Sequence, residues 1–128
     1  MGIDIYARWR DQSSREKDLQ ITGFSIGHGH VGYLREAYHG GPYATQILMP
    51  EAFQKEDRKH GVPIPAFILR RRLPQAIGAA VIRERTVYGN ADANIENCEM
   101  AKSLGDFVDL CERKERETGE PCRIIASF

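Results

Sequence analysis

Residues 23–45 hold most of the side chains in this sequence that could perform chemistry. The segment contains six of the twelve glycines, three of the four histidines and three of the five tyrosines. Imidazoles and phenols on a glycine-rich backbone are typical of a ligand-facing loop, because binding residues concentrate on loops. A tightly turned segment whose rings pack on a sheet has the same composition and is the structural alternative. The candidate ligand-binding residues are His28, His30, Tyr33, Arg35, Glu36, Tyr38, His39 and Tyr43.

Two of these histidines have the spacing of a pair of metal ligands. His28 and His30 are two positions apart, so an extended backbone would place both imidazoles on one face. His39, Glu36 or Asp4 would supply a third ligand and leave an open position for the water that hydrolysis needs. Histidines of an ordinary turn have the same short pattern. We therefore expect no cofactor, with a divalent metal at His28 and His30 as the alternative.

The same segment also supports acid–base or anion-binding chemistry without a metal. A neutral imidazole, here that of His39, is well suited to act as a general base near pH 7. Arg35 would clamp a carboxylate or phosphate group, unless it forms a salt bridge with its neighbour Glu36. A small anionic ligand is therefore one candidate partner.

Residues 27–32 match the glycine pattern GxGxxG of dinucleotide-binding folds. In those folds the glycines precede a helix whose N-terminus receives a pyrophosphate. Here any helix after the pattern must end before Gly40, which leaves it short. The pattern alone therefore does not indicate a nucleotide.

Charge is balanced overall but unevenly distributed along the chain. The formal net charge is zero, which argues against a nucleic-acid partner because such proteins carry a basic excess. Residues 51–91 contain eight bases and four acids, whereas residues 92–121 contain nine acids and four bases. We expect these two segments to face each other, within the fold or across a dimer. A basic face for an anionic ligand is the alternative, although the bases of residues 70–72 would fan out around a helix.

Three cysteines indicate a reducing compartment. Cys98, Cys111 and Cys122 are odd in number and lack CxxC spacing, so they fit neither a disulfide framework nor a zinc site. The first residues have no signal-peptide pattern, and no apolar run reaches the length of a membrane span. We therefore expect a soluble, cytoplasmic protein with free thiols and no membrane partner.

Periodicity predicts strands and helices in an order that is not a regular repeat. Alternation predicts a strand at 3–9, and apolar runs predict further strands at 20–26, 43–49 and 122–128. The capping-box pattern of Ser13 and Glu16 predicts a short helix that ends before Ile21, and a further short helical piece is expected at 33–38. A helix is expected at 66–87, which Pro74 breaks or kinks. Another helix is expected at 93–118, ending at Gly119. The last helix has an apolar stripe at Ile95, Cys98, Ala101, Leu104, Val108 and Cys111.

These elements fit an α+β fold in a single domain, 1–128, with one sheet of about four strands and two or three helices packed on one face. No motif covers enough of the chain to indicate a family, and the sequence leaves open whether the protein is an enzyme. We expect a small non-catalytic binding or interaction domain that forms a homodimer. A small histidine-dependent or metal-assisted hydrolase with its site in residues 23–45 is the alternative.

Overall fold

Alternation at the N-terminus forms an inner strand of the sheet. The computed structural model of the chain describes residues 2–22, 30–54 and 60–128. Strand β1 (Gly2–Arg8) buries Ile3, Ile5 and Ala7 and leaves the residues between them half-buried. Successive side chains point to opposite faces of a strand, so β1 presents one face to a core and the other away from it.

Four antiparallel strands form the sheet of the described residues, in the order β2-β1-β4-β3. Strands β2 (Tyr33–Ala37) and β4 (Arg123–Ser127) flank β1, and the short β3 (Val62–Pro63) pairs with β4. In this register Asp4 of β1 lies opposite Arg35 of β2 and Ser127 of β4.

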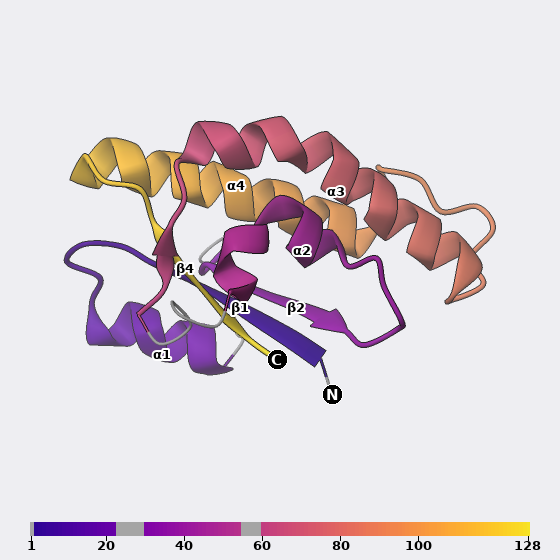
Figure 1. Cartoon of the computed structure of the whole chain (residues 1–128), viewed down its shortest axis with the longest axis horizontal. Coiled ribbons are helices and arrows are strands. Elements are labelled where there is room, and N and C mark those ends of the chain that lie inside the picture. The colour runs from indigo at the N-terminus through magenta and orange to yellow at the C-terminus, as the bar shows by residue number, and fades with distance from the viewer. Residues whose placement is uncertain (1, 23–29, 55–59) are drawn as a thin grey trace.

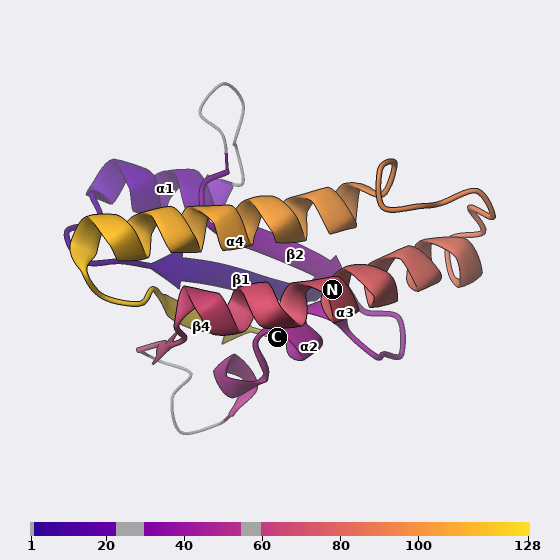
Figure 2. The same cartoon turned by 90° about the horizontal axis from the view of Figure 1, so that it is seen from above.

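Helices α3 (Ala66–Thr86) and α4 (Glu99–Thr118) lie side by side across one face of this sheet (Figures 1 and 2). The shorter helices are α1 (Ser14–Thr22), α2 (Ala44–Leu48) and the 3₁₀-helix η1 (Pro50–Phe53). The core between the layers contains Leu69, Leu104, Phe107, Val108 and Ile124, all fully buried. The α+β prediction of a four-stranded sheet with helices packed on it is confirmed. None of the helices in the described ranges is long and apolar enough to cross a membrane.

Two local signals of the sequence are confirmed at the helices. In the capping box, Ser13 Oγ accepts the Glu16 N–H at 3.1 Å and the Glu16 carboxylate accepts the Ser13 N–H at 2.9 Å. Gly119 ends α4 with a φ of 76°, a left-handed conformation that glycine adopts without strain. Pro74 lies inside α3, which continues through it as one helix, so the expected break at Pro74 is wrong.

The basic and acidic segments meet within the chain. Arg70 of α3 forms ion pairs with Asp109 and Glu112 of α4. At the start of α3, the Ala66 N–H donates to the Glu115 carboxylate at 3.1 Å. The two long helices are therefore joined by charged contacts above the core.

Two predicted elements have the wrong type: the expected helix is a strand, and the expected strand is a helix. Residues 33–38, expected to be helical, contain β2, and residues 43–49, expected to be a strand, contain α2. The cause is the carboxylate of Glu36, which accepts the N–H groups of Ala44 at 2.8 Å and Thr45 at 3.0 Å. This carboxylate caps the N-terminus of α2. Because the cap comes from another element, no local sequence pattern reveals it.

The helix expected at 93–118 begins only at Glu99. Asn94 Oδ1 accepts two backbone N–H groups and Asn97 Oδ1 accepts the Asn94 N–H at 2.8 Å, which holds a turn instead. Ile95, expected on the buried stripe, lies in this turn and is 65% exposed. The prediction for Ile95 is therefore wrong.

The prediction of a strand at 20–26 is wrong for residues 20–22, the part of this range that the structure describes. Residues 20–22 form the end of α1, which therefore continues past the expected end before Ile21. Residues 23–26 lie outside the described ranges. The side chain of Gln20 is fully buried, and its contacts place α1 beside the sheet.

Candidate functional site

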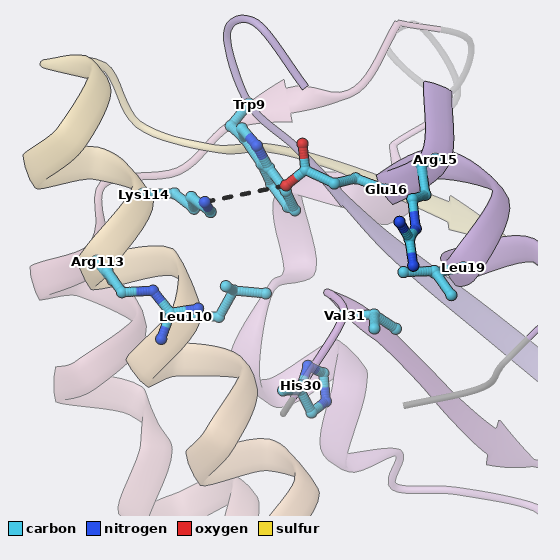
Figure 3. A pocket seen from close by; sticks show the side chains of 9 residues that line it. All are labelled: Trp9, Arg15, Glu16, Leu19, His30, Val31, Leu110, Arg113 and Lys114. Carbon is cyan, nitrogen blue, oxygen red and sulfur yellow. Dashed lines mark ion pairs between the residues drawn. The ribbon is translucent and has the colours of Figure 1, made fainter. Parts of the chain in front are cut away.

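A pocket of about 420 Å³ lies between α1, α4 and the chain segments that leave β1 and enter β2 (Figure 3). This volume lies in the range of small-molecule sites. We call it the Trp9 pocket, and it is lined by Trp9, Arg15, Glu16, Leu19, His30, Val31, Leu110, Arg113 and Lys114.

Buried Gln20 positions the wall that α1 contributes. Its Nε2 donates to the carbonyls of Ala7 at 2.8 Å and Val31 at 2.9 Å, and its Oε1 accepts a hydrogen bond from Arg8. Gly32 permits this approach, because a Cβ there would lie 2.7 Å from the Gln20 amide nitrogen and its φ is 85°. The end of α1 is thereby held against the start of β2.

Two arginines reach the pocket without a partner among the described residues. Arg15 of α1 and Arg113 of α4 form no hydrogen bond or ion pair with any described residue. Figure 3 shows them on opposite sides of the pocket. A guanidinium group presents five N–H donors in a fixed plane, which suits a carboxylate, sulfonate or phosphate group.

Lys114 is already engaged at the same pocket. Its Nζ lies 4.0 Å from the Glu16 carboxylate and 5.1 Å from the centre of the Trp9 ring (Figure 3). The same Nζ lies 3.1 Å from the Glu117 carboxylate. Among the described residues that line the pocket, Glu16 is the one acid, and it is offset by this ammonium group. The two unpaired arginines leave the pocket with a positive balance.

His30 is held in one orientation at the pocket. Its Nδ1 accepts the Gly32 N–H at 3.0 Å, and its Nε2 lies 3.4 Å from Ser103 Oγ. Because Nδ1 accepts, a neutral ring carries its proton on Nε2. Burial lowers the pKa of His30 from 6.5, against an opposing effect of Asp106. The ring is therefore neutral at pH 7 and adds no charge to the pocket.

Apolar side chains form the remaining walls: Trp9, Leu19, Val31 and Leu110. Trp9 is the only tryptophan of the chain, so its fluorescence reports on this pocket alone. Apolar walls with a few convergent polar groups are typical of small-molecule sites. The combination fits a ligand with an apolar body and an anionic group.

A cluster of polar side chains is buried between β2, α2 and α3. We call it the Glu36 cluster: Glu36, His39, Tyr43, Thr45 and Arg83. Arg83 Nη1 donates to the Glu36 carboxylate, and Thr45 Oγ1 donates to it at 2.6 Å. Burial alone would raise the pKa of Glu36, but the hydrogen bonds from Thr45 and the Ala44 N–H together with the Arg83 charge lower it. Glu36 is therefore ionised at neutral pH and neutralised by Arg83.

One ring nitrogen of His39 accepts a hydrogen bond within the Glu36 cluster, and the other is buried without a hydrogen-bond partner among the described residues. Nδ1 accepts the Gly41 N–H at 3.2 Å, and Nε2 lies 3.5 Å from Glu36 Oε2. The ring packs on Tyr43 with 4.3 Å between centres, and the side chain is 3% exposed. No lone pair of a neutral His39 is open to a substrate, so this arrangement does not suit a general base.

The predicted site residues that are described divide between several places. Glu36, His39 and Tyr43 come together in the Glu36 cluster, and His30 lines the Trp9 pocket. The predicted set is therefore not assembled into one site.

The other predicted residues lie elsewhere. Tyr33 and Arg35 alternate with the buried residues of β2 and donate to Asp4 at 2.6 and 2.7 Å, on the sheet face turned away from α3 and α4. Tyr38 is 45% exposed, and His28 lies outside the described residues. The salt bridge of Arg35 is thus made with Asp4 and not with its sequence neighbour.

Within the described ranges, no group of three or more histidine, cysteine, aspartate or glutamate side chains is arranged to hold a metal ion. The pair predicted from the sequence also includes His28, which is not described. The glycine pattern at 27–32 leads into strand β2 and not into a helix. It therefore lacks the helix N-terminus that a pyrophosphate needs.

Most residues of the Trp9 pocket escaped prediction. Leu110, Arg113 and Lys114 have the three-to-four spacing of one helix face, at the border of the apolar stripe of α4. The capping box was the usable signal on the other wall, because it fixes where Arg15 and Leu19 lie on α1.

Comparisons of the chain with models of protein families, with curated proteins and with solved structures gave no match. The functional argument therefore rests on the geometry of the pocket.

Proposed function

We propose that the protein is a small non-catalytic binding domain whose Trp9 pocket holds a small organic anion. The observation that carries this proposal is a pair of arginines, Arg15 and Arg113, that face apolar walls around Trp9 and have no partner in the described part of the chain. An unpaired guanidinium beside apolar surface gains most from a ligand that brings both an anionic group and an apolar body.

The magnitudes favour a ligand of moderate affinity. A hydrogen bond to a charged group contributes about 1.5–3 kcal/mol. Burial of apolar ligand surface against Leu19, Val31 and Leu110 adds to this by about 25 cal/mol for each Å². Since association also costs several kcal/mol, we expect dissociation constants in the micromolar range.

The histidine-dependent or metal-assisted hydrolase is the second candidate. Its support in the described residues is His30, which lines the pocket. A base at His30 would have to release the Gly32 N–H from Nδ1 or the contact of Nε2 with Ser103. The binding function needs no such change, and we therefore prefer it.

Self-association is part of the proposal. Its support is a group of apolar side chains, 53% to 65% exposed, at the end of α3 and in the turns that follow: Ile82, Val87, Tyr88 and Ile95. Apolar groups gathered on a surface are typical of interfaces. Light scattering after gel filtration should give a dimer that Ile82→Asp converts to a monomer. A monomeric parent protein would remove this part of the proposal.

A cytoplasmic location is also proposed. Three buried cysteines without a disulfide are its support.

The test uses two aromatic probes that differ by one anionic group. 8-Anilinonaphthalene-1-sulfonate carries a sulfonate, and N-phenyl-1-naphthylamine is its neutral counterpart. We expect quenching of Trp9 by both, with tighter binding of the sulfonate. Arg15→Gln combined with Arg113→Gln should lower the affinity for the sulfonate probe by about tenfold or more and leave the affinity for the neutral probe unchanged.

The matched control is Arg116→Gln, an exposed arginine on α4 that does not line the pocket. It should bind both probes as the parent protein does. The proposal would be contradicted if the double variant lost the same affinity for both probes, or if Arg116→Gln lowered the affinity for the sulfonate probe as much as the double variant does. Hydrolysis of nitrophenyl esters or phosphates that is lost in His30→Gln would support the second candidate instead.

A further inference from the structure

A second pocket, of about 410 Å³, lies between α2, α3 and the loop that joins β2 to α2. Helix α2 packs beside α3 at this place (Figure 1). We call it the Gly78 pocket; its apolar walls include Pro42, Ile47, Ala79 and Ile82, and His39 and Arg83 of the Glu36 cluster form a polar wall. No residue lines both this pocket and the Trp9 pocket, so the two are separate.

Two buried N–H groups of the polar wall lack an acceptor. His39 Nε2 and Arg83 Nε have no hydrogen-bond partner in the part of the chain that is described, and their side chains are 3% and 7% exposed. Because His39 Nδ1 accepts the Gly41 N–H, a neutral ring carries its proton on Nε2, so both nitrogens are donors. A buried donor without an acceptor costs free energy, which a ligand with an acceptor recovers.

The two donors belong to side chains that meet at one carboxylate oxygen. His39 Nε2 lies 3.5 Å from Glu36 Oε2, which is longer than an N–H···O hydrogen bond, and Arg83 Nη1 donates to the same oxygen. Arg83 Nη2 donates to the Pro42 carbonyl at 2.7 Å. These contacts hold both side chains in place and leave Nε2 of the ring and Nε of the guanidinium to a ligand.

The charges at this wall favour a neutral ligand. Glu36 is ionised and neutralises Arg83, so the wall offers N–H donors without a net positive charge. A carboxylate or phosphate would be repelled by Glu36, whereas a carbonyl oxygen brings an acceptor without a charge. The apolar walls suit an apolar body, because pockets for small molecules combine apolar surface with a few polar groups.

A glycine inside a helix leaves room for such a body. Gly78 lies within α3, and a Cβ there would meet no atom within 4 Å. Glycine is unfavourable in a helix interior, so this position is occupied by a residue that the helix itself does not favour. A leucine at this position would occupy the pocket without displacing the backbone.

We propose that the Gly78 pocket binds a small neutral molecule with an apolar body and a carbonyl oxygen, which accepts hydrogen bonds from His39 Nε2 and Arg83 Nε. Both nitrogens are closed to solvent, so a small side-chain movement in the pocket wall admits the oxygen. The proposal does not depend on anion binding at the Trp9 pocket, and loss of that function would leave it unchanged.

The test compares two neutral probes that differ by one oxygen, acetophenone and ethylbenzene. Nuclear magnetic resonance of the ¹⁵N-labelled full chain follows the Arg83 Nε–H and His39 Nε2–H protons. We expect acetophenone to shift both protons downfield in a saturable way and to bind about tenfold or more tightly than ethylbenzene. Apolar walls alone would give the opposite order, because ethylbenzene is the more apolar probe.

Two glycines provide a matched pair of variants. Gly78→Leu should lower the affinity for acetophenone by about tenfold or more, because the new side chain fills the pocket. Gly105→Leu is the control: Gly105 also lies inside a helix, α4, with no atom within 4 Å of a Cβ, and it does not line the pocket. It should bind acetophenone as the parent protein does.

The self-association surface proposed above shares Ile82 and Val87 with this pocket. The titrations therefore use a protein concentration at which light scattering gives a single species. With that condition met, a difference between the two probes reports on the pocket and not on a change of oligomeric state.

Several results would overturn the proposal. Ethylbenzene that binds as tightly as acetophenone, or saturating acetophenone that leaves both N–H protons unshifted, would show that a buried water or Glu36 satisfies these donors instead. An equal loss of affinity in Gly78→Leu and Gly105→Leu would also contradict it. The comparison of probes on the parent chain needs no variant, so poor folding of a leucine variant would not obscure the answer.

Discussion

The Glu36 cluster and the Trp9 pocket contain the same residue types and use them in opposite ways. In the cluster, Arg83 donates to Glu36 and to the Pro42 carbonyl, and the Glu36 and Arg83 side chains are 2% and 7% exposed. In the pocket, Arg15 and Arg113 have no partner in the part of the chain that is described. A buried charge requires a partner, because it has lost its hydration, whereas a charge at an open pocket stays hydrated until a ligand binds. Pairing, and not residue type, therefore separates a structural group from a binding site.

The largest expected effect is the loss of stability when the buried pair is broken. Arg83→Met should lower the free energy of unfolding by about 3–5 kcal/mol, because it leaves the Glu36 carboxylate buried without its cation. Arg15→Met in the pocket should change it by less than about 0.5 kcal/mol, because no described contact is lost. Urea unfolding followed by circular dichroism measures both.

A double variant makes this prediction sharper. Adding Glu36→Gln to Arg83→Met removes the orphaned charge and should restore part of the stability lost by Arg83→Met alone. Similar losses for Arg83→Met and Arg15→Met would erase the distinction between the two regions.

The two regions should also lose stability in different pH ranges. The pKa of Glu36 is lowered from 4.5 in the folded state, so its contribution is fully present above pH 4.5 and is lost as the pH falls through the folded pKa. The pKa of His30 is lowered from 6.5, so the unfolded chain takes up a proton first as the pH falls below 6.5. Stability should therefore fall in two steps, the first of which starts near pH 6.5.

His30→Gln separates the steps. This variant should flatten the dependence of unfolding free energy on pH just below pH 6.5 and leave the acid step of Glu36 unchanged. Urea unfolding across this pH range is the measurement. A parent protein whose stability rises as the pH falls from 7 to 6 would contradict the pKa direction of His30.

The smallest expected effect concerns the exposed pairs between α3 and α4. Arg70 binds Asp109 and Glu112, but its side chain is 44% exposed and water screens the charges. Arg70→Gln should cost no more than about 1 kcal/mol of unfolding free energy. A loss as large as that of Arg83→Met would show that pairing matters more than burial.

The parts of the fold that follow local rules could be predicted from the sequence. Alternation at 3–9, the capping box at Ser13 and the left-handed end of α4 at Gly119 each depend on neighbouring residues. Residues 33–49 could not be predicted, because Glu36 joins β2 to the N-terminus of α2. Glu36 lies on the face of β2 that is turned toward the helices, where hydrophobic patterning predicts an apolar residue. Its position is explained only by Arg83, which donates a hydrogen bond to it.

The candidate site was less predictable for a related reason. Composition drew attention to the histidines and tyrosines, and several of these have contacts that stabilise the fold, as His39 has with Gly41. The Trp9 pocket combines residues from both ends of the chain, from Trp9 to Lys114. No spacing pattern can relate residues that only the packing of α1 beside α4 brings together.

The central claim is that an organic anion binds at Arg15 and Arg113 and not at the paired charges of the Glu36 cluster. Nuclear magnetic resonance of the ¹⁵N-labelled chain, titrated with 8-anilinonaphthalene-1-sulfonate, tests it most directly. The account predicts saturable shifts at the backbone amides of Arg15, Val31 and Arg113 and at the Trp9 indole, with Glu36 and Arg83 unchanged. Shifts centred on Glu36 and Arg83, or no saturable shift at the pocket, would contradict it.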